Sequence, residues 1–404
     1  MSLYRRLFGE HTQLHLMVAL LIALTLFFNI ATSGRMLTAQ NAYNLLAGNA
    51  YILVLAIGML MVIVIGQIDL SVGSVAGFVS MTVALLFEGM GVPWWLGLVC
   101  GLLIGGLIGV WNGIWISRVG IPGFIVTLAG MMLFRGAIVW ESRSLSFPLP
   151  GECQVLGAGT LPQWGPSWTG MNNSTLLVGV VTASVLVVNV IRRYRRRVVR
   201  GAIEAELWIP AVRCALIMVA VGALTWLFGG DTSTSAFPVP GLLLLILVFA
   251  YVLLTEHTAF GRHVYAVGGN AHAAALSGVN TRAVQFAVMV NMGVLAALAG
   301  MMFAGRATAA GPQDGTLWEL DAIAAVFIGG AAVSGGVGTV TGAVLGGLVM
   351  AVLNNGLLLL GVPSDRSQVI KGLVLLMAVA FDMYSRRRFD VSLSSRLFAA
   401  QVRR

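Results

Sequence analysis

Long apolar segments recur along the whole chain, and this constrains its fold more than any other feature. A helix of about 20 apolar residues crosses the roughly 30 Å of hydrocarbon in a bilayer. Only 10% of the 404 residues are charged, whereas soluble domains carry about 25%. Because backbone polar groups in lipid must be satisfied within their own segment, such runs fold as helices. The sequence therefore predicts an all-α, polytopic integral membrane protein with one transmembrane domain over residues 1–404.

We expect between ten and twelve membrane-spanning helices. The first apolar run, His15–Ala31, is long and lacks an Ala-x-Ala exit, so it reads as a permanent helix and not as a cleaved signal. The segment 319–333 is too short for an ordinary crossing, which suggests a re-entrant element. The expected spans are approximately 14–33, 43–65, 69–88, 94–117, 122–140, 174–191, 208–229, 238–255, 283–304, 319–333, 339–360 and 368–384.

The positive charge of the chain gathers beside the ends of these spans. The net charge is +9, and arginines cluster at Arg192–Arg200 and Arg386–Arg388. Basic residues in this position are typical of cytoplasmic membrane anchors, so nucleic acid is not an expected partner. With Arg5 and Arg6 inside, the basic loop 192–200, the loop 261–280 and the basic tail 385–404 all become cytoplasmic. Both termini then lie on the cytoplasmic side of the membrane.

The longest loop lies on the opposite side in this orientation. Residues 141–173 are then external, with Trp164 and Trp168 at interfacial depth. Of the three cysteines, Cys153 falls in this loop, and Cys100 and Cys214 fall inside apolar spans. Neither a disulfide framework nor a metal site follows from that spacing.

Glycines form two stripes at intervals of four residues. One stripe comprises Gly97, Gly101, Gly105, Gly109 and Gly113, and the other Gly338, Gly342 and Gly346. A stripe of this kind removes side chains from one helix face and lets a neighbouring backbone approach closely. It indicates either tightly crossed helices within the chain or a dimer face.

Two polar, glycine-rich segments interrupt the apolar pattern, at Gly66–Ser74 and Gly335–Thr339. At membrane depth such breaks are tolerated where they are buried in protein or line a water-filled cavity, and transporters place substrate sites at broken helices. Asp69 and Asp321 are therefore candidates for lining a pathway. The alternative is that each carboxylate caps the span that follows it, and the two roles are compatible.

The stretch Gly261–Asn280 is the longest polar-leaning segment between two apolar spans in the C-terminal half. Asn270 is a candidate N-cap, Ala273–Leu276 are strong helix formers, and Gly278 is placed to end the helix one turn later. A short, capped helix outside the membrane can act as a rigid lever for another protein. We expect this segment to be the contact with a partner protein.

Four motifs of the sequence, taken in their order along the chain, resemble those of a known family. Gly66–Ser74, Pro122–Met131, Gly268–Asn280 and Glu319–Ala325 occur in the order found in the ribose/xylose/arabinose permeases, the membrane subunits of bacterial ABC sugar importers. The resemblance extends from about Asn41 to Asp382. Within the family, Ile121–Ala137 and the arginine-rich loop with its flanking spans look most like the D-xylose permeases. A multiple-sugar permease for ribose, arabinose or galactose is similar in these segments and stays an alternative.

The resemblance implies a division of labour. A periplasmic binding protein delivers a monosaccharide, two permease copies form a homodimeric pathway with the ABC importer permease fold, and two cytoplasmic ABC ATPase subunits drive alternating access. Ala273–Gly278 matches the Ala-Ala-x-x-x-Gly core of the coupling helix that docks into the ATPase. His272 stands where relatives carry Glu, and Ala275 where they carry Arg, so we expect docking through backbone shape and apolar contact. The predicted coupling residues are Gly269, Asn270, His272, Ala273, Ala274, Leu276, Ser277 and Gly278.

The chain itself lacks the elements of nucleotide hydrolysis. A P-loop requires a lysine that reaches the β- and γ-phosphates, but the single lysine is Lys371, followed by Gly372 within an apolar span. The histidines show no ligand spacing with nearby Cys or Asp, and no Ser/His/Asp arrangement has the surroundings of a hydrolase. We therefore expect a translocation subunit that is not an enzyme, with no metal or bound cofactor, whose partner ATPase uses the ATP.

Several polar residues inside spans are candidates for the substrate path. Arg135 lies well within span 122–140, where a charge is costly; it can pair with Glu141, border the path or extend to the outer interface. Amides such as Asn112, Asn291, Asn354 and Asn355 could bond sugar hydroxyls, although interhelical hydrogen bonds are their commoner use. The candidate path residues are Asp69, Ser71, Asn112, Arg135, Asp321 and Asn354.

Two other classes of protein compete with this interpretation. An ion-coupled secondary sugar transporter would carry relays of acids or histidines within its spans, and here Asp69 and Asp321 lie near span ends. A membrane receptor or scaffold for the binding protein would carry out no transport.

Overall fold

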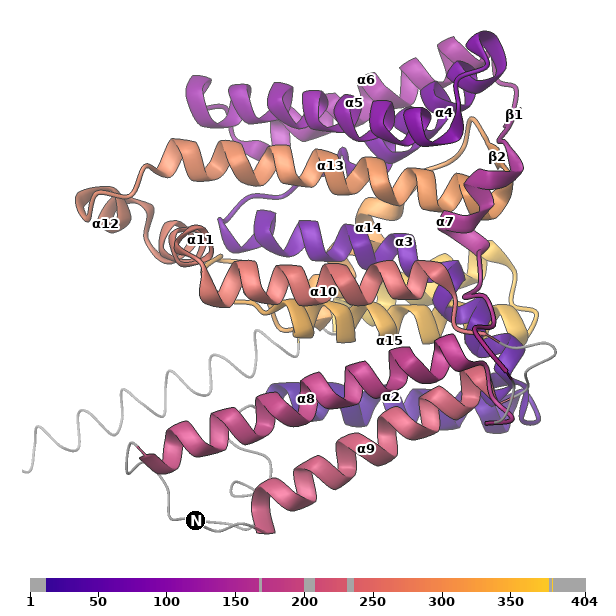
Figure 1. The fold of residues 1–404 in the computed structure, drawn as a ribbon. Helices are drawn as coiled ribbons and strands as arrows, with labels where there is room; N and C mark the ends of the chain where they lie inside the picture. The colour runs from indigo at the N-terminus through magenta and orange to yellow at the C-terminus, as the bar shows by residue number, and fades with distance from the viewer. Residues whose placement is uncertain (1–11, 167–168, 200–207, 231–235, 378–379, 381–404) are drawn as a thin grey trace, which may run out of the picture.

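The computed structural model describes residues 12–166, 169–199, 208–230, 236–377 and 380. It consists almost entirely of helices (Figure 1). The elements are α2 (Thr12–Ala31), η1 (Arg35–Leu37), α3 (Ala39–Val64), α4 (Val72–Met90), α5 (Trp94–Ile114), η2 (Trp115–Val119), α6 (Gly123–Ser142), β1 (Phe147–Pro148), η3 (Gly151–Cys153), α7 (Gln154–Ala158), α8 (Asn173–Val199), α9 (Trp208–Gly229), α10 (Val239–His257), α11 (Ala259–Gly269), α12 (Ala271–Leu276), α13 (Thr281–Ala307), β2 (Ala309–Ala310), α14 (Trp318–Ile328) and α15 (Val340–Leu359).

Ten helices within the described residues are long and apolar enough to cross a membrane. This confirms the predicted all-α, multi-pass architecture. The segment expected to be short is the 11-residue helix α14, which covers about 16 Å at 1.5 Å per residue. The last expected span is helical over 364–377. The N-terminal arginines, Trp168, Arg200 and the tail 385–404 lie outside the described residues.

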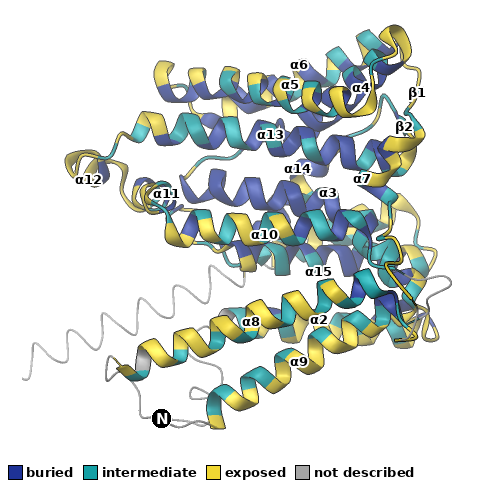
Figure 2. Cartoon of the chain, in the orientation of Figure 1, coloured by how far each residue is buried: buried dark blue, intermediate teal, exposed yellow. Residues whose placement is uncertain are grey.

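Helix α3 forms the centre of the bundle. Nearly all of its residues after Asn49 are buried, including Leu53 and Ile57, which have no exposed surface. A helix that is apolar on every side needs neighbours on every side, and α10, α13, α14 and α15 surround α3 (Figures 1 and 2). The core of the molecule therefore lies along a membrane-spanning axis.

The first glycine stripe packs within the chain. Gly101, Gly105 and Gly109 of α5 face α13, and a Cβ added to Gly109 would lie 2.6 Å from the carbonyl oxygen of Met289. Gly342 and Gly346 of the second stripe face the end of α14 in the same manner. Of the two interpretations, tightly crossed helices therefore account for both stripes.

The two ends of the bundle differ in structure. At one end α11 and α12 extend beyond the long helices, and at the other a short antiparallel ladder joins β1 to β2 beside α7 (Figure 1). Helices α8 and α9 pair with each other as a hairpin at the edge of the bundle. These features place the candidate site at the α12 end and along the adjoining helix breaks.

Candidate functional site

Helix α12 forms as the sequence predicts. The Asn270 side chain accepts a hydrogen bond from the backbone N–H of Ala273 at 2.9 Å, which satisfies one free donor of the first turn. Gly278 follows the helix with φ of 84°, a left-handed conformation that favours glycine. The predicted N-cap and the predicted terminator are both confirmed, and a rigid six-residue helix results.

The surface of α12 is open to a partner. Ala274 is buried against the bundle, whereas His272, Ala273, Leu276 and Ser277 are exposed, Leu276 at 78%. Figure 1 shows α12 projecting past the ends of α10 and α13. An exposed leucine on a projecting helix can bury its apolar side chain in a partner's groove.

Three backbone breaks meet directly behind α12 in what we call the glycine junction, formed by Val64–Gly66, Gly268–Gly269 and Gly335–Gly338. The N–H of Gly336 donates to the carbonyl oxygen of Val64 at 2.8 Å. A Cβ added to Gly336 would lie 2.9 Å from the Cα of Gly269, and one on Gly268 would overlap the Val64 carbonyl oxygen. The segment that carries α12 is thus in backbone contact with both polar breaks.

Tyr265 adds a side-chain link to this junction. Its hydroxyl donates to the carbonyl oxygen of Gly338 at 2.8 Å. Burial, reinforced by the Glu256 carboxylate, raises the pKa of Tyr265, so the hydroxyl stays protonated and able to donate near neutral pH. Sequence reasoning missed both this residue and the role of Gly268 and Gly336, because nothing local indicates which break contacts which.

The first break leads from the junction to a buried polar network. Asp69 accepts hydrogen bonds from the backbone N–H and the hydroxyl of Ser71, at 2.8 and 2.7 Å. The Asn112 amide donates to the Ser71 hydroxyl at 3.2 Å, and the Thr127 hydroxyl accepts from the N–H of Leu70 at 3.1 Å. The structure therefore brings together three of the predicted path residues, Asp69 and Ser71 directly before α4 and Asn112 on α5.

The simple capping interpretation of the two aspartates is wrong. Ser71 occupies the N-cap of α4, and Asp69, two residues earlier, orders the approach to it. Asp321 lies within the first turn of α14, behind an N-cap at Leu317. Both carboxylates nevertheless lie near positively polarised helix N-termini.

Arg135 bonds to the loop between β2 and α14 instead of to Glu141. Its guanidinium donates to the carbonyl oxygen of Asp314 at 2.9 Å, and Glu141 accepts from Thr82 at 3.1 Å. Residues six positions apart point to different sides of a helix, which explains why Glu141 is no partner. Burial raises the pKa of Asp314, opposed by its hydrogen bond from Gly311 and by Arg135.

Asp321 forms an ion pair that the sequence analysis did not anticipate. The Lys371 ammonium lies 3.0 and 3.2 Å from its two carboxylate oxygens, and the side chains are 15% and 25% exposed. An opposite charge within the apolar helix 364–377 was the available signal, since isolated charges in a membrane pair with one another. The pair attaches the helix 364–377 to α14.

Most of the in-span amides bond to other helices. Asn41 donates to Asn355 at 2.9 Å, Tyr251 donates to Asn291, and Asn112 donates to Ser71. The carbonyl oxygens of Asn112 and Asn354 are buried without a protein partner in the described residues. These two candidates keep acceptor capacity for a ligand hydroxyl.

In the part of the chain that the structure describes, no group of three or more His, Cys, Asp or Glu side chains could hold a metal ion.

The fold and the site define a class of protein: a multi-pass membrane protein with polar helix breaks and a short exposed helix at one end of the bundle. Comparison with known proteins identifies the family. Residues 41–147 and 173–379 match the model of the family described as "Branched-chain amino acid transport system / permease component". The chain belongs to this family of permease components.

Curated relatives match over nearly the full length of both chains. The xylose transport system permease protein XylH of Escherichia coli (strain K12) is 37% identical over 377 residues, 93% of each chain. XylH of Haemophilus influenzae is 34% identical over 95% of this chain and 99% of its own. The ribose import permease protein RbsC of Escherichia coli (strain K12) is 30% identical over 91% of this chain and 92% of its own. No solved structure matches the chain.

Proposed function

We propose that this chain is the membrane-spanning subunit of an ATP-driven ABC importer that carries a monosaccharide, D-xylose, across the bacterial inner membrane. The observation that carries the proposal is the match to the xylose permease along 93% of both chains. A partner ATPase supplies the energy, and this chain binds neither a cofactor nor a metal of its own.

A sugar suits the polar groups of the helix breaks better than an amino acid does. The buried network is built from hydroxyl and amide groups with a hydrogen-bonded carboxylate, and Asn112 and Asn354 retain free carbonyl oxygens. A neutral polyol is held by such hydrogen-bonding groups, whereas a zwitterion needs unpaired charges of both signs. Here Asp321 is paired with Lys371, and Arg135 is bonded to the Asp314 carbonyl oxygen. We therefore propose Asp69, Ser71, Asn112, Arg135, Asp321 and Asn354 as the pathway candidates, with Asp321 tied to Lys371 in this conformation.

Coupling runs through the glycine junction in this proposal. The ATPase binds the exposed face of α12 and moves α11 and α12 together as a rigid unit. Because Gly268 and Gly269 contact Gly336 and the Val64 carbonyl, this movement is transmitted to both breaks. Helices α4 and α15 then re-orient, and the cavity opens to the other side of the membrane by alternating access.

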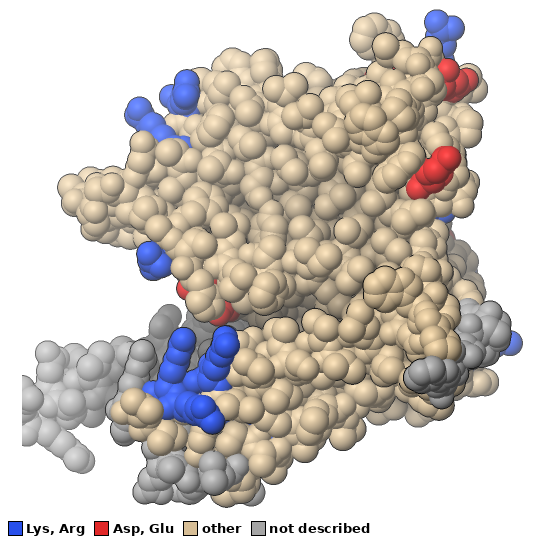
Figure 3. Space-filling model, viewed as in Figure 1, with Lys and Arg blue, Asp and Glu red and all other residues tan. Residues whose placement is uncertain are grey.

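The remaining partners follow from the same scheme. A second copy of the permease completes the pathway, and a periplasmic sugar-binding protein docks at the end that carries α7, β1 and β2. Arg118, Arg262 and Arg282 are exposed near the α12 end, which supports a cytoplasmic location for α12 by the positive-inside rule. Basic side chains are visible on that end in Figure 3.

Complementation of a bacterial strain that lacks its xylose permease tests the substrate. Cells expressing this chain should regain uptake of labelled D-xylose, and excess unlabelled xylose should compete better than ribose or arabinose. Equal competition by all three sugars would favour the multiple-sugar alternative. Uptake that an uncoupler abolishes while ATP is maintained would favour an ion-coupled transporter.

A further inference from the structure

The hairpin of α8 and α9 stands apart from the bundle over most of its length. Its two helices pack chiefly on each other, and most of their apolar side chains are exposed, including Val181, Val185 and Val188 of α8 at 53%, 38% and 41%. In Figure 2 both helices carry exposed residues along their length. In a membrane, that surface is covered by acyl chains.

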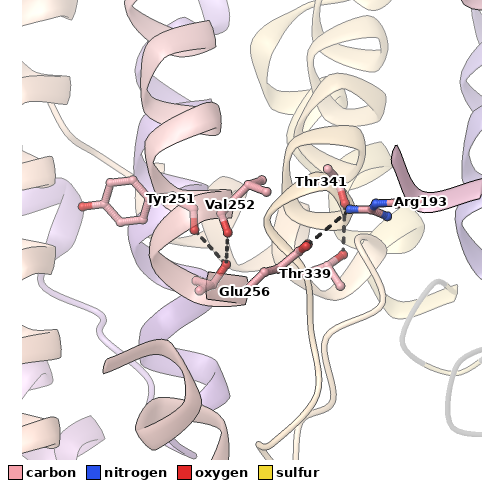
Figure 4. Close-up of polar contacts among 7 residues, drawn as sticks. Arg193, Tyr251, Val252, Glu256, Thr339 and Thr341 are labelled. Atoms are coloured by element: carbon pink, nitrogen blue, oxygen red, sulfur yellow. Dashed lines mark hydrogen bonds and ion pairs between the residues drawn. The ribbon is translucent and has the colours of Figure 1, made fainter. Parts of the chain in front are cut away.

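A cluster of arginines follows the apolar part of α8. Arg192, Arg193, Arg195 and Arg196 are exposed, and Figure 3 shows basic side chains gathered at this end of the hairpin. Arg193 alone among these four has a carboxylate partner in the described residues, Glu256 of α10 at 3.5 Å. Figure 4 shows this contact beside Thr339 and Thr341, at the start of α15.

The other three arginines continue the lipid-facing stripe of α8. Residues 181, 185, 188, 192 and 195 follow one another at intervals of three or four, and with residue 196 they lie within about 100° of arc on one helix face. Arg193 lies about 100° away around the helix, toward the bundle. One face of α8 therefore presents apolar side chains over the hydrocarbon and guanidinium groups at its edge. We name Arg192, Arg195 and Arg196 the arginine edge.

We propose that the arginine edge binds the phosphate headgroup of an anionic phospholipid whose acyl chains lie along Val181, Val185 and Val188. Guanidinium groups match phosphate oxygens bidentately, and clusters of basic residues next to a membrane span are attracted to anionic lipid. Continuity with the lipid-facing stripe favours a lipid over a soluble phosphate or an acidic protein surface, since neither would use the valines. Arg193 meanwhile holds the same end of α8 against α10.

Lipid retention measured by mass spectrometry on the purified full-length protein tests this site. The protein is purified from nanodiscs of phosphatidylcholine with phosphatidylglycerol, and bound phosphatidylglycerol is counted per chain. Arg192→Gln with Arg196→Gln removes two charges from the arginine edge. Arg118→Gln with Arg282→Gln is the matched control, because it removes two exposed charges from elsewhere on the chain. Arg192→Lys with Arg196→Lys keeps the charge.

The proposal predicts a loss of phosphatidylglycerol affinity on the order of twentyfold in the first variant. Retained phosphatidylcholine should be unchanged, the control should be near wild type and the lysine variant should lose less. Equal loss in the first variant and the control would show a general charge effect and overturn the assignment, as would no loss in either. If the glutamine variant does not fold, the wild type and the lysine variant are washed with 0.5 M salt. Electrostatic binding of the headgroup is screened at about that ionic strength. Undiminished retention of phosphatidylglycerol in both proteins would therefore also contradict the proposal. Displacement by inorganic phosphate alone would assign the edge to soluble anions instead.

Discussion

At the scale of single residues, the membrane interior makes each charge depend on its partner. Lys371 is the single lysine of the chain, and its ammonium lies 3.0 Å from Asp321. Arg135 instead reaches a backbone carbonyl, that of Asp314. Removing one member of a buried pair leaves the other charge uncompensated, which costs more than the pair contributes. Substitution of a buried ion pair is therefore expected to lower the free energy of unfolding more than substitution of an exposed one.

Lys371→Met should lower the free energy of unfolding by about 3 kcal/mol, because Asp321 would remain buried and unpaired. Adding Asp321→Leu should recover much of that loss. Thermal unfolding in detergent measures both. The exposed pair Arg193–Glu256, with side chains 71% and 44% exposed, is the control, and Glu256→Gln should cost less than about 1 kcal/mol. Similar effects at the two sites would contradict the burial argument.

Gly278→Val should weaken the contact with the ATPase. The left-handed backbone at this position, φ of 84°, is strained for a β-branched residue, so the end of α12 would unwind. ATPase co-purification and sugar uptake should both fall at least severalfold. Gly361→Val is the matched control, since Gly361 also has a positive φ and open space around it but lies after α15. Undiminished co-purification by the Gly278 variant would remove α12 as the docking element.

At the scale of elements, local features could be predicted from sequence and long-range contacts could not. The start and end of α12 follow from Asn270 and Gly278, because capping acts within a turn. The partner of Asp321 lies 50 residues away, and the glycine junction joins segments around residues 64, 268 and 336. The sequence marked all three segments as glycine-rich or broken. Their meeting point depends on how the spans pack, which no local pattern encodes.

The junction gives a prediction at this scale. In Gly268→Ala, the added methyl would overlap the Val64 carbonyl oxygen, forcing α11 away from the first break. ATPase should still co-purify because α12 is intact, but stimulation of ATP hydrolysis by the sugar-loaded binding protein should be lost. Gly89→Ala is the control, because a Cβ there meets nothing within 4 Å. Normal stimulation in the Gly268 variant would exclude the junction as the transmission path.

At the scale of the whole molecule, the chain presents two chemically different ends. The α12 end carries the larger number of exposed arginines, among them Arg118, Arg262 and Arg282, and the opposite end carries Arg143 and Glu152 with the half-buried Asp314. Within the described residues, ten candidate spans connect the two ends. The chain is similar over more than 90% of its length to permeases of xylose and ribose transport systems. This similarity fits a subunit that forms the transport pathway while a partner supplies the energy.

Cysteine labelling in intact cells tests the proposed orientation. After Cys100, Cys153 and Cys214 are replaced, Ser277→Cys on the α12 end should react with a membrane-impermeant maleimide only when the inner membrane is opened. Glu152→Cys at the other end should react in cells with a permeabilised outer membrane. The reverse pattern would invert the topology and place α12 out of reach of a cytoplasmic ATPase.

Transport by reconstituted vesicles tests the central claim most directly. Proteoliposomes are prepared with the permease alone, with the permease and its ATPase, and with both plus the sugar-binding protein, and each is given labelled D-xylose. We predict accumulation above the external concentration only in the complete system with ATP supplied to the ATPase. Accumulation by the permease alone under an ion gradient would contradict the account, and so would ATP hydrolysis by the complete system without any sugar entering.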